Sequence, residues 1–411
     1  MKGSGGSKMS IVNTSNFSIL KTNNLLEIKN LSVDYYASNG TVHALTDVSI
    51  ILERGKILGL AGESGSGKST LAYAITRLLR PPAAITGGQL LYYPRIRDGE
   101  DGERLKGSSR ANARVTHSST MAGPTEAVDI LQFNPAELRE FRWSELSIVF
   151  QSAMNALNPV INIGAQITDV LRTHRPQMGA DSRHKRAIEL LRLVGIAPDR
   201  IKSYPHELSG GMRQRAIIAI ALALSPELII MDEPTTALDV VVQREILREI
   251  MQLREHLNFS VIFITHDLSL LLEIADKIAI MYAGRLVETA TRSELHHQPR
   301  HPYSYGLLNS FPTLTGPRRR MTGIPGSPPD LRAIPPGCAF HPRCPLAFEA
   351  CRTTLPRLLS SAPETPEQLV ACHLYDDRFN AAERPTNAGF ADSYESAYGR
   401  EEATQGMRNA E

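Results

Sequence analysis

A glycine-rich stretch at 62–69, with the sequence GESGSGKS, has the residue types and spacing of a phosphate-binding loop. Glycines let the backbone wrap a phosphate with its N–H groups, and the N-terminus of a following helix adds a favourable dipole. In this pattern Lys68 reaches the β- and γ-phosphates of a nucleotide, and the Ser69 hydroxyl ligates Mg²⁺. An apolar segment at 57–60 precedes the loop and a helical pattern at 70–79 follows it. The loop and its flanks therefore predict a nucleotide site.

A second acidic feature lies at 228–233, where the apolar run LIIM ends in two carboxylates, Asp232 and Glu233. A buried strand that delivers carboxylates at its C-terminal end suits a site beside a phosphate-binding loop. We expect Asp232 to hold Mg²⁺, usually through water. We expect Glu233 to polarise the attacking water as the general base.

A third feature is the sequence LSGGMRQR at 208–215. Ser209, Gly210 and Gly211 stand before a helical pattern at 212–224, so they form another helix N-terminus able to face an anion. This segment cannot duplicate the glycine loop on the same nucleotide. The three features together predict a nucleotide-hydrolysing protein.

The composition supports a folded protein of several domains. The chain has 411 residues, 42% of them hydrophobic and 21% charged, which predicts two or three domains with a sizeable core. The formal net charge is +2, so nucleic-acid binding is not expected. The longest apolar run, 216–224, is too short to span a bilayer, and the Gly/Ser-rich start has no secretory signal. We expect a cytoplasmic protein whose membrane role comes through a partner.

The elements that must position these residues follow from the patterning. Strand-like alternation at 25–60 predicts antiparallel strands, and alternating helical and strand patterns at 216–285 predict a largely parallel α/β sheet. The expected divisions are a flexible leader at 1–24, a nucleotide-binding domain at 25–290 with a solvated insertion at 94–127 and a helical subdomain at 150–207, a cysteine-containing extension at 291–377, and a disordered tail at 378–411.

The order of these motifs resembles that of the ATPase subunits of ABC transporters over about 25–290. The resemblance implies a P-loop NTPase cassette with an antiparallel β-subdomain, a RecA-like core and a helical subdomain. It also implies a dimer in which each ATP lies between residues 62–70 of one cassette and 209–211 of the other.

Further site residues are carried over from this resemblance. Gln151 resembles the glutamine that senses Mg²⁺ and the γ-phosphate, and Asp239 the aspartate that crosses the dimer interface. His266 resembles the histidine that contacts the γ-phosphate. Tyr35 resembles the aromatic residue that stacks on adenine, and Tyr36 is its neighbouring alternative.

The expected ATP site thus comprises three overlapping sets. The expected catalytic residues are Lys68, Gln151, Glu233 and His266. The expected Mg²⁺ ligands are Ser69, Gln151 and Asp232. The residues expected to contact nucleotide are Tyr35, Gly62, Ser64, Gly65, Gly67, Lys68, Ser69, Thr70, Gln151, Ser209, Gly210, Gly211 and Asp239.

Four cysteines lie in the last quarter of the chain, at Cys338, Cys344, Cys351 and Cys372. Soft thiolates suit an iron–sulfur cluster or Zn²⁺, and four reduced, unliganded thiols are the alternative. The sequences HPYS at 301–304, IPGSPP at 324–329 and PGCAFHPRC at 336–344 resemble the C-terminal extension of oligopeptide and dipeptide importer ATPases. That resemblance implies a [4Fe–4S] cluster, with Zn²⁺ as the alternative, pinning a proline-rich region that cannot build its own core.

The two resemblances together imply a function and a set of partners. The expected function is ATP hydrolysis in an ABC importer of peptides or related solutes, including oligosaccharides. Two membrane permeases, a sister ATPase or a second copy, and an extracytoplasmic solute-binding protein are the expected partners, with the chain on the cytoplasmic face of the cell membrane. The alternative is a soluble ABC ATPase in DNA repair or translation, which the absence of long coiled coils and of a second cassette disfavours.

Overall fold

The structure is a computed structural model of the chain. It describes residues 23–38, 40–95, 127–151, 156–235, 238–310, 323–379 and 384–408, and side chains as far as 397. The predicted leader at 1–24 and insertion at 94–127 lie almost wholly outside the described residues.

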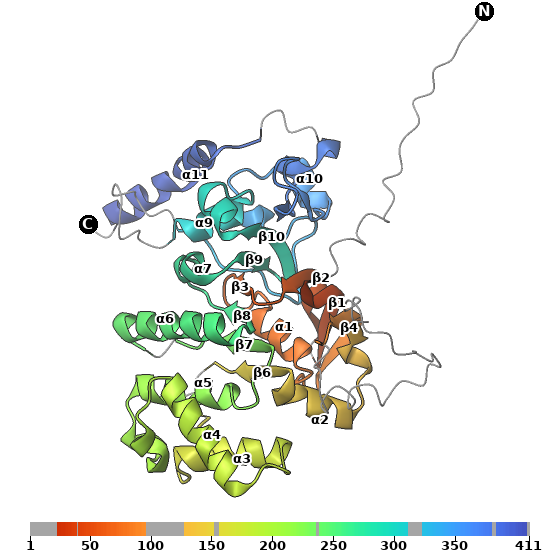
Figure 1. Cartoon of the computed structure of the whole chain (residues 1–411). Helices are drawn as coiled ribbons and strands as arrows, with labels where there is room; N and C mark the ends of the chain where they lie inside the picture. Colours follow the sequence, from red (N-terminus) through yellow and green to blue (C-terminus); the bar gives the residue numbers. More distant parts are fainter. Residues whose placement is uncertain are drawn as a thin grey trace, which may run out of the picture.

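One antiparallel sheet forms from the N-terminal strands. Its order among the described residues is β2-β1-β4-β5, with β1 at Asn24–Ala37, β2 at Gly40–Glu53, β4 at Ala83–Tyr92 and β5 at Val128–Asp129. Alternate apolar residues of these strands point into a shared core. The sheet flanks helix α1 (Figure 1).

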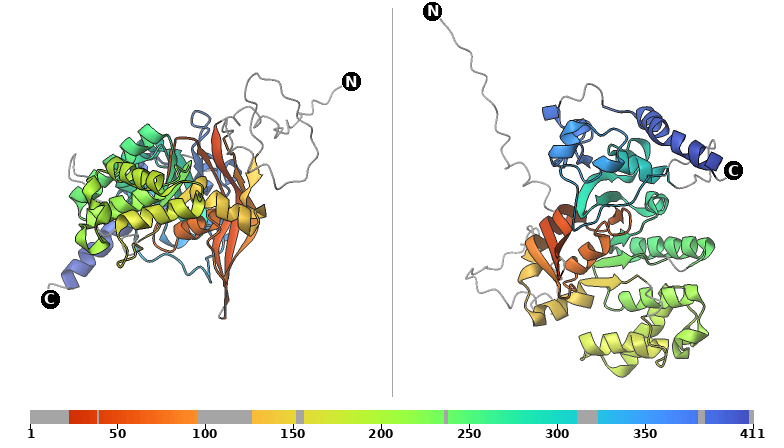
Figure 2. Two further views of the ribbon diagram at one scale, coloured as in Figure 1. Left: turned by 60° about the horizontal axis from the view of Figure 1, so that its bottom comes forward. Right: turned by 180° about the vertical axis from the view of Figure 1, so that it is seen from behind.

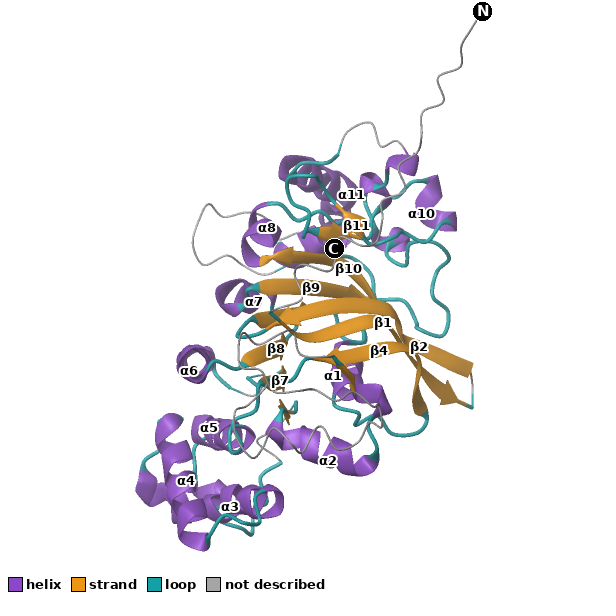
Figure 3. Cartoon of the chain, turned by 45° about the vertical axis from the view of Figure 1, so that its right-hand side comes forward, coloured by secondary structure: helices purple, strands orange, loops and turns teal. Residues whose placement is uncertain are grey.

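A second, larger sheet runs through the middle of the molecule (Figure 3). Its order among the described residues is β11-β12-β10-β9-β3-β8-β7-β6. The strands are β3 (Ile57–Ala61), β6 (Leu146–Val149), β7 (Leu228–Asp232), β8 (Ser260–Ile264), β9 (Lys277–Tyr282), β10 (Arg285–Thr291), β11 (Leu359–Ser360) and β12 (Leu369–Val370). Strands β9, β3, β8, β7 and β6 are parallel, and the others are antiparallel.

The parallel strands are buried on both faces, which explains their continuous apolar runs. In β7, Leu228 and Ile230 pack into the core shared with the antiparallel sheet. Ile229 and Met231 pack on the opposite face, into the core shared with the helices. Each parallel strand therefore joins two cores, and its ends are held firmly in place.

Helices cover the sheet and form a separate group at one end of the molecule (Figures 1 and 2). They are α1 (Lys68–Ile75), α2 (Pro135–Ser144), α3 (Ile163–His174), α4 (Ala180–Leu193), α5 (Gly210–Ala221), α6 (Val240–Leu257), α7 (Leu268–Ile274), α8 (Arg292–His297), α9 (Pro302–Leu308), α10 (Glu349–Thr353) and α11 (Asn387–Arg408). Helices α3, α4 and α5 pack on one another away from the antiparallel sheet. Within the described residues, every helix is too short or too polar to cross a membrane.

The C-terminal region continues the large sheet rather than standing apart from it. Strand β10 pairs with β9, and β12 pairs with β10. The carboxylate of Glu288 in β10 is fully buried and accepts the backbone N–H groups of Arg300 and His301, both at 2.8 Å, and the amide of Gln368 at 3.1 Å. The expected α/β cassette, with an antiparallel subdomain and a C-terminal extension, is confirmed.

The region from residue 378 onward differs from our expectation of disorder, because the structure has helix α11 there. Phe390 and Tyr394 lie one turn apart and are fully buried; the Phe390 ring stacks on Tyr305 of α9, and the Tyr394 ring packs against it at a tilt. The Tyr394 hydroxyl also donates to the carbonyl of Pro302 at 2.8 Å. Two aromatic side chains on one helix face are enough to dock an otherwise polar segment.

Candidate functional site

The phosphate loop connects β3 to α1, and Lys68 is the first residue of the helix. Gly67 caps the helix with φ 103°, and a Cβ there would lie 2.7 Å from the carbonyl oxygen of Ala44, so only glycine fits. The Lys68 amine donates to the carbonyls of Gly62 at 2.7 Å and Glu63 at 2.9 Å. Burial lowers the pKa of Lys68, and the nearby carboxylates of Glu233, Asp232 and Glu63 oppose that shift.

Asp232 ends β7 directly beside this loop. Its side chain is 1% exposed, and neither carboxylate oxygen has a hydrogen bond of standard geometry from the described residues. Burial raises the pKa of Asp232, while the Ser69 hydroxyl and the Lys68 amine lower it. A buried carboxylate beside a serine hydroxyl, with no hydrogen bond of standard geometry to its oxygens from the described residues, fits an oxygen-liganded cation such as Mg²⁺.

Three of the expected catalytic residues meet at Glu233. Its carboxylate accepts a hydrogen bond from the Gln151 amide at 3.0 Å, and its other oxygen lies 3.2 Å from Nδ1 of His266. The three residues follow β6, β7 and β8, whose carboxyl ends meet at one edge of the parallel sheet. Glu233 adopts φ 45°, a left-handed backbone conformation that is uncommon for a non-glycine residue.

The two candidate adenine-stacking residues differ in exposure. Tyr35 lies in β1, paired with Val42 and Ala83, and is partly buried against the core of the antiparallel sheet. Tyr36 is 55% exposed. Tyr35 is also near enough to Tyr73 of α1 to raise that residue's pKa, an effect smaller than that of burial and of Asp232.

The signature segment lies apart from the phosphate loop of its own chain. Ser209 caps α5 by accepting the Met212 N–H at 3.2 Å, and Asp239 caps α6 by accepting those of Val241 and Val242 at 3.1 and 3.0 Å. Among the described residues, no hydrogen bond or ion pair joins Ser209–Gly211 to the phosphate loop. The single chain thus brings together the loop, Gln151, Asp232, Glu233 and His266, but not the signature.

The fold and the site define an ABC-type ATPase. The family described as "ABC transporter" matches residues 45–236, and "Oligopeptide/dipeptide transporter, C-terminal region" matches residues 287–351. The dimeric structure of a post-hydrolysis state of the ATP-binding cassette MJ0796, bound to ADP and Pi, superimposes with a TM-score of 0.51 at 25% identity. It covers 65% of this chain and 99% of that one.

Similar proteins of known name place the chain more narrowly among ABC-type ATPases. The oligopeptide transport ATP-binding protein OppD of Bacillus subtilis is 40% identical over 335 residues, 80% of this chain and 84% of the relative. OppD of Escherichia coli is 40% identical over 354 residues, 85% of this chain and 92% of the relative. The dipeptide transport ATP-binding protein DppD of Lactococcus lactis is 41% identical over 322 residues, 78% and 82% of the two chains. The chain therefore belongs to the family of oligopeptide and dipeptide ABC transporter ATP-binding subunits.

The prediction of a [4Fe–4S] cluster was wrong. In the described part of the chain, no three side chains of His, Cys, Asp or Glu are arranged to hold a metal ion, and the zinc alternative fails on the same finding. The relatives' names describe transport ATP-binding proteins and mention no cluster. Cys338, Cys344, Cys351 and Cys372 are free thiols, and burial raises the pKa of Cys338 to about 11 and that of Cys344 to about 12.

The physical premise behind that prediction also fails. We expected a proline-rich region that needs a metal because it has no core. Instead, Phe340 is 1% exposed and packs against Tyr282 of β9 and Tyr303 of α9, with ring centroids 5.3 Å from both. The backbone N–H of Cys338 also donates to the carbonyl of Cys351 at 2.8 Å. The extension uses the core of the cassette, and hydrogen bonds hold its cysteine loop.

The sequence analysis missed a set of residues next to the phosphate loop. Glu63, inside the loop, contacts Arg343 and Tyr303 of the extension. Arg343 lies between Cys338 and Cys344, and this segment was interpreted as part of a metal site. Glu63 and Arg343 are 280 positions apart, and no sequence motif links them.

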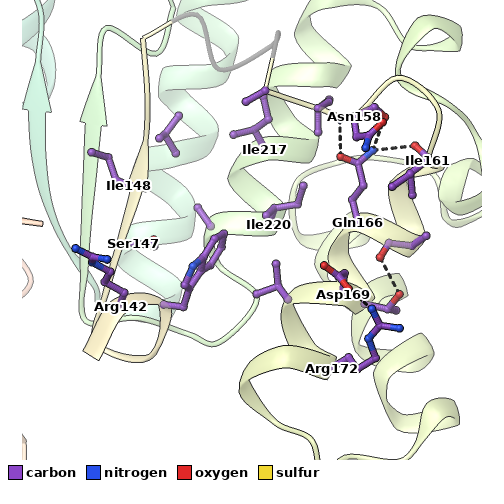
Figure 4. Close-up of a pocket in the computed structure, with 18 of the residues that line it drawn as sticks. Arg142, Ser147, Ile148, Asn158, Ile161, Gln166, Asp169, Arg172, Ile217 and Ile220 are labelled. Carbon is purple, nitrogen blue, oxygen red and sulfur yellow. Dashed lines mark hydrogen bonds and ion pairs between the residues drawn. The ribbon is translucent and has the colours of Figure 1, made fainter. Parts of the chain in front are cut away.

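A large cavity of about 1070 Å³ opens between β6 and helices α3 and α5 (Figure 4). Ile148, Ile217 and Ile220 contribute apolar side chains to its wall. At its rim the Gln166 amide donates to the carbonyls of Asn158 and Ile161, at 3.1 and 2.8 Å. The chain continues from strand β6, which forms one wall, to Gln151, so the cavity adjoins the candidate hydrolysis site.

Proposed function

We propose that this chain is the ATP-hydrolysing subunit of a peptide importer that acts from the cytoplasmic face of the cell membrane. The observation that supports this most directly is the contact of Gln151 and His266 with the Glu233 carboxylate, beside the phosphate loop. The names of the curated relatives, peptide and dipeptide transport ATP-binding proteins, favour peptides as the solute. They give no support to a role in DNA repair or translation.

The hydrolysis step follows from the positions of these groups. The loop N–H groups and Lys68 bind the β- and γ-phosphates and offset their charge. Glu233 orients a water for in-line attack on the γ-phosphate and accepts its proton. His266 and Gln151 hold the Glu233 carboxylate in position. Tyr35 stacks on adenine.

Mg²⁺ fits the site beside Asp232. Ser69 and Asp232 would hold it, with Gln151 reaching it from the end of β6. When bound, it would supply positive charge to offset that of the β- and γ-phosphates.

The active unit that we propose contains two cassettes. Gly62–Thr70 of one cassette and Ser209–Gly211 of the other hold each ATP between them, and Asp239 lies at the interface. The separation of Ser209 from the loop within one chain supports this arrangement. The second cassette is a sister subunit or a second copy.

The cavity next to Gln151 is the proposed docking site for a segment of a membrane permease. Ile148, Ile217 and Ile220 give its wall apolar surface, charged side chains such as Asp169 and Arg172 also line it, and Ile161 is 39% exposed. An apolar side chain of the permease placed there would sit beside the strand that ends at Gln151. Nucleotide-dependent movement of Gln151 would then reach the permease through β6 and α3.

The test is a pull-down of the tagged full-length chain from gently solubilised membranes. Three forms are compared: wild type, Ile161→Asp, and Leu257→Asp on α6, whose side chain is equally exposed at 39%. We expect wild type and Leu257→Asp to bring down two permeases, a solute-binding protein and any sister ATPase. We expect Ile161→Asp to lose the permeases and keep ATP binding. Recovery of only soluble partners or nucleic acid would refute the importer function.

The solute is identified with the captured binding protein. Short peptides and oligosaccharides of matched size are tested for binding by calorimetry. Peptide binding supports the proposal, and binding of oligosaccharides alone refutes the peptide assignment.

A further inference from the structure

The C-terminal extension contacts the phosphate loop through a two-pronged ion pair. Arg343, 7% exposed, donates to both carboxylate oxygens of Glu63, at 2.7 and 2.9 Å. Glu63 directly follows Gly62 inside the loop. Paired hydrogen bonds between a guanidinium and a carboxylate fix orientation as well as distance. Residue 343 therefore sets where the Glu63 side chain lies.

A second contact fixes the backbone of the same residue. The Glu63 N–H donates to the Tyr303 hydroxyl at 2.8 Å, and the Glu63 carbonyl accepts from the Lys68 amine at 2.9 Å. The extension thus holds both the backbone N–H and the carboxylate of a residue whose carbonyl contacts the phosphate-binding lysine. Glu63 therefore connects Arg343 to Lys68 directly.

Arg343 is itself held rigidly. Its Nε donates to the carbonyl of Pro325 at 2.8 Å, and its guanidinium lies 5.9 Å from the ring centre of Tyr282 and 6.0 Å from that of Phe340. A small cavity of about 90 Å³ separates Glu63–Ser66 from Pro328, Pro329 and Leu331 of the extension. The extension therefore also borders the loop on this side.

We propose that Arg343 and Tyr303 are positioning residues for ATP binding, acting through Glu63 on the phosphate loop. They hold the loop in the shape that presents its N–H groups and Lys68 to the β- and γ-phosphates. The C-terminal extension is in this way part of the nucleotide site. The proposal rests on the ATP-binding function of the cassette but not on the solute or the permeases.

A merely structural role predicts a different result. If the ion pair only attaches the extension to the cassette, its loss lowers stability and leaves the folded protein's nucleotide preference unchanged. If it positions the loop, its loss weakens the binding of ATP selectively. AMP lacks the β- and γ-phosphates, so its affinity serves as the internal reference.

The matched control is Arg300→Met. Arg300 also belongs to the extension, is also 7% exposed, and lies 5.7 Å from the ring centre of Tyr375. Its side chain hydrogen-bonds to Gln368 and not to the phosphate loop. Loss of Arg300 removes a buried arginine of the extension without touching Glu63.

The experiment measures dissociation constants for ATP and AMP with the full-length chain, together with thermal unfolding. We expect Arg343→Met to weaken ATP binding about tenfold and to leave AMP binding unchanged. Arg343→Lys keeps the charge but loses the paired geometry, so we expect an intermediate loss. Arg300→Met should lower stability and leave both constants as in wild type.

A double variant tests whether Arg343 acts through Glu63. We expect Glu63→Gln with Arg343→Met to bind ATP no more weakly than Arg343→Met alone, because both changes remove one interaction. Wild-type ATP affinity in Arg343→Met and Arg343→Lys would overturn the proposal, as would parallel losses of ATP and AMP binding. Should Arg343→Met fail to fold, Arg343→Lys and Glu63→Gln provide the same comparison. Failure of the pull-down would leave these constants unaffected.

Discussion

At the scale of single residues, the proposed hydrolysis site depends on how one carboxylate is held. Glu233 stands between Gln151 and His266 on the first left-handed position after β7. The neighbouring carboxylate, Asp232, is more deeply buried, and burial raises its pKa. Two adjacent carboxylates therefore have different environments, which suits one to orient water and the other to meet a cation.

Glu233→Gln keeps the side-chain shape but cannot accept a proton. We expect ATP hydrolysis to fall by about 10²- to 10⁴-fold, while ATP still binds because the phosphate loop is unchanged. Steady-state phosphate release and equilibrium ATP binding check the two parts. Glu255→Gln, an exposed carboxylate on α6, is the control and should hydrolyse ATP at the wild-type rate. Unchanged hydrolysis in Glu233→Gln would remove Glu233 from the mechanism.

At the scale of elements, buried polar caps and aromatic contacts join the extension to the cassette. His301 caps α9 by accepting the Tyr303 N–H at Nδ1, at 3.0 Å. Glu288 of β10 accepts the N–H groups that precede the helix. The end of β10 and the start of α9 are thus one hydrogen-bonded unit, and α11 packs on its outer side.

His301 makes this unit sensitive to acid. Burial lowers the pKa of His301 from its ordinary 6.5 to about 3, so the unfolded chain binds a proton more readily than the folded one between these values. Its contribution to stability is complete above pH 6.5 and is lost as the pH falls towards 3, by about 2 kcal/mol at pH 5.

The check is urea unfolding of wild type and His301→Asn at pH 7.5 and pH 5. Asparagine keeps a capping side chain but does not titrate, so we expect the variant to lose less stability on acidification. His256→Asn, at an exposed position of α6, should behave like wild type. Equal acid sensitivity in wild type and His301→Asn would contradict the assignment.

Helix α11 should contribute measurably to stability despite its polar sequence. Phe390 is completely buried against α9, so Phe390→Ala leaves a cavity, and we expect it to lower the free energy of unfolding by about 3–5 kcal/mol. Glu395→Ala, exposed on the same helix, controls for helix propensity. Urea unfolding and limited proteolysis of the C-terminal segment measure the effect. Indistinguishable variants would mean that α11 does not dock in solution.

At the scale of the whole molecule, one chain holds only part of the proposed ATP site. The loop, Asp232, Glu233 and His266 gather at one sheet edge, whereas the signature caps α5 in the helical group. The helical group also forms one wall of the large cavity. In the arrangement that we propose, closure onto a second cassette and contact with a permease would therefore involve the same set of helices.

Ser209→Arg tests this division. We expect the full-length chain to bind ATP like wild type, because Ser209 lies outside its own loop, but to hydrolyse ATP about a hundredfold more slowly in the assembled complex. Asn162→Ala is the control, since it removes an equivalent cap, the 2.7 Å hydrogen bond from Ala165 on α3, and should retain hydrolysis. ATP binding lost in step with hydrolysis would contradict a role for Ser209 on the partner's nucleotide.

The sequence by itself predicted the cassette fold and the residues that we propose for its ATP site. The motifs at 62–69 and 228–233 also predict local structure, because each joins a buried strand to the loop that follows it. Parallel strands then bring those loops to one edge, so the proximity of Gln151, Glu233 and His266 was predictable. The choice between Tyr35 and Tyr36 was not, because alternation alone does not say which face of a strand meets the base.

Only the tertiary structure decided how the C-terminal region packs against the cassette. The clustering of four cysteines and the resemblance of the extension predicted a metal, whereas packing of Phe340 on Tyr282 and Tyr303 supplies the core that the metal was expected to replace. The pairing of Arg343 with Glu63 and the docking of α11 likewise join segments far apart in the chain. Such contacts depend on which surfaces meet after folding. Local residue patterns predict which side chains lie on a surface, but not which other surface they will contact.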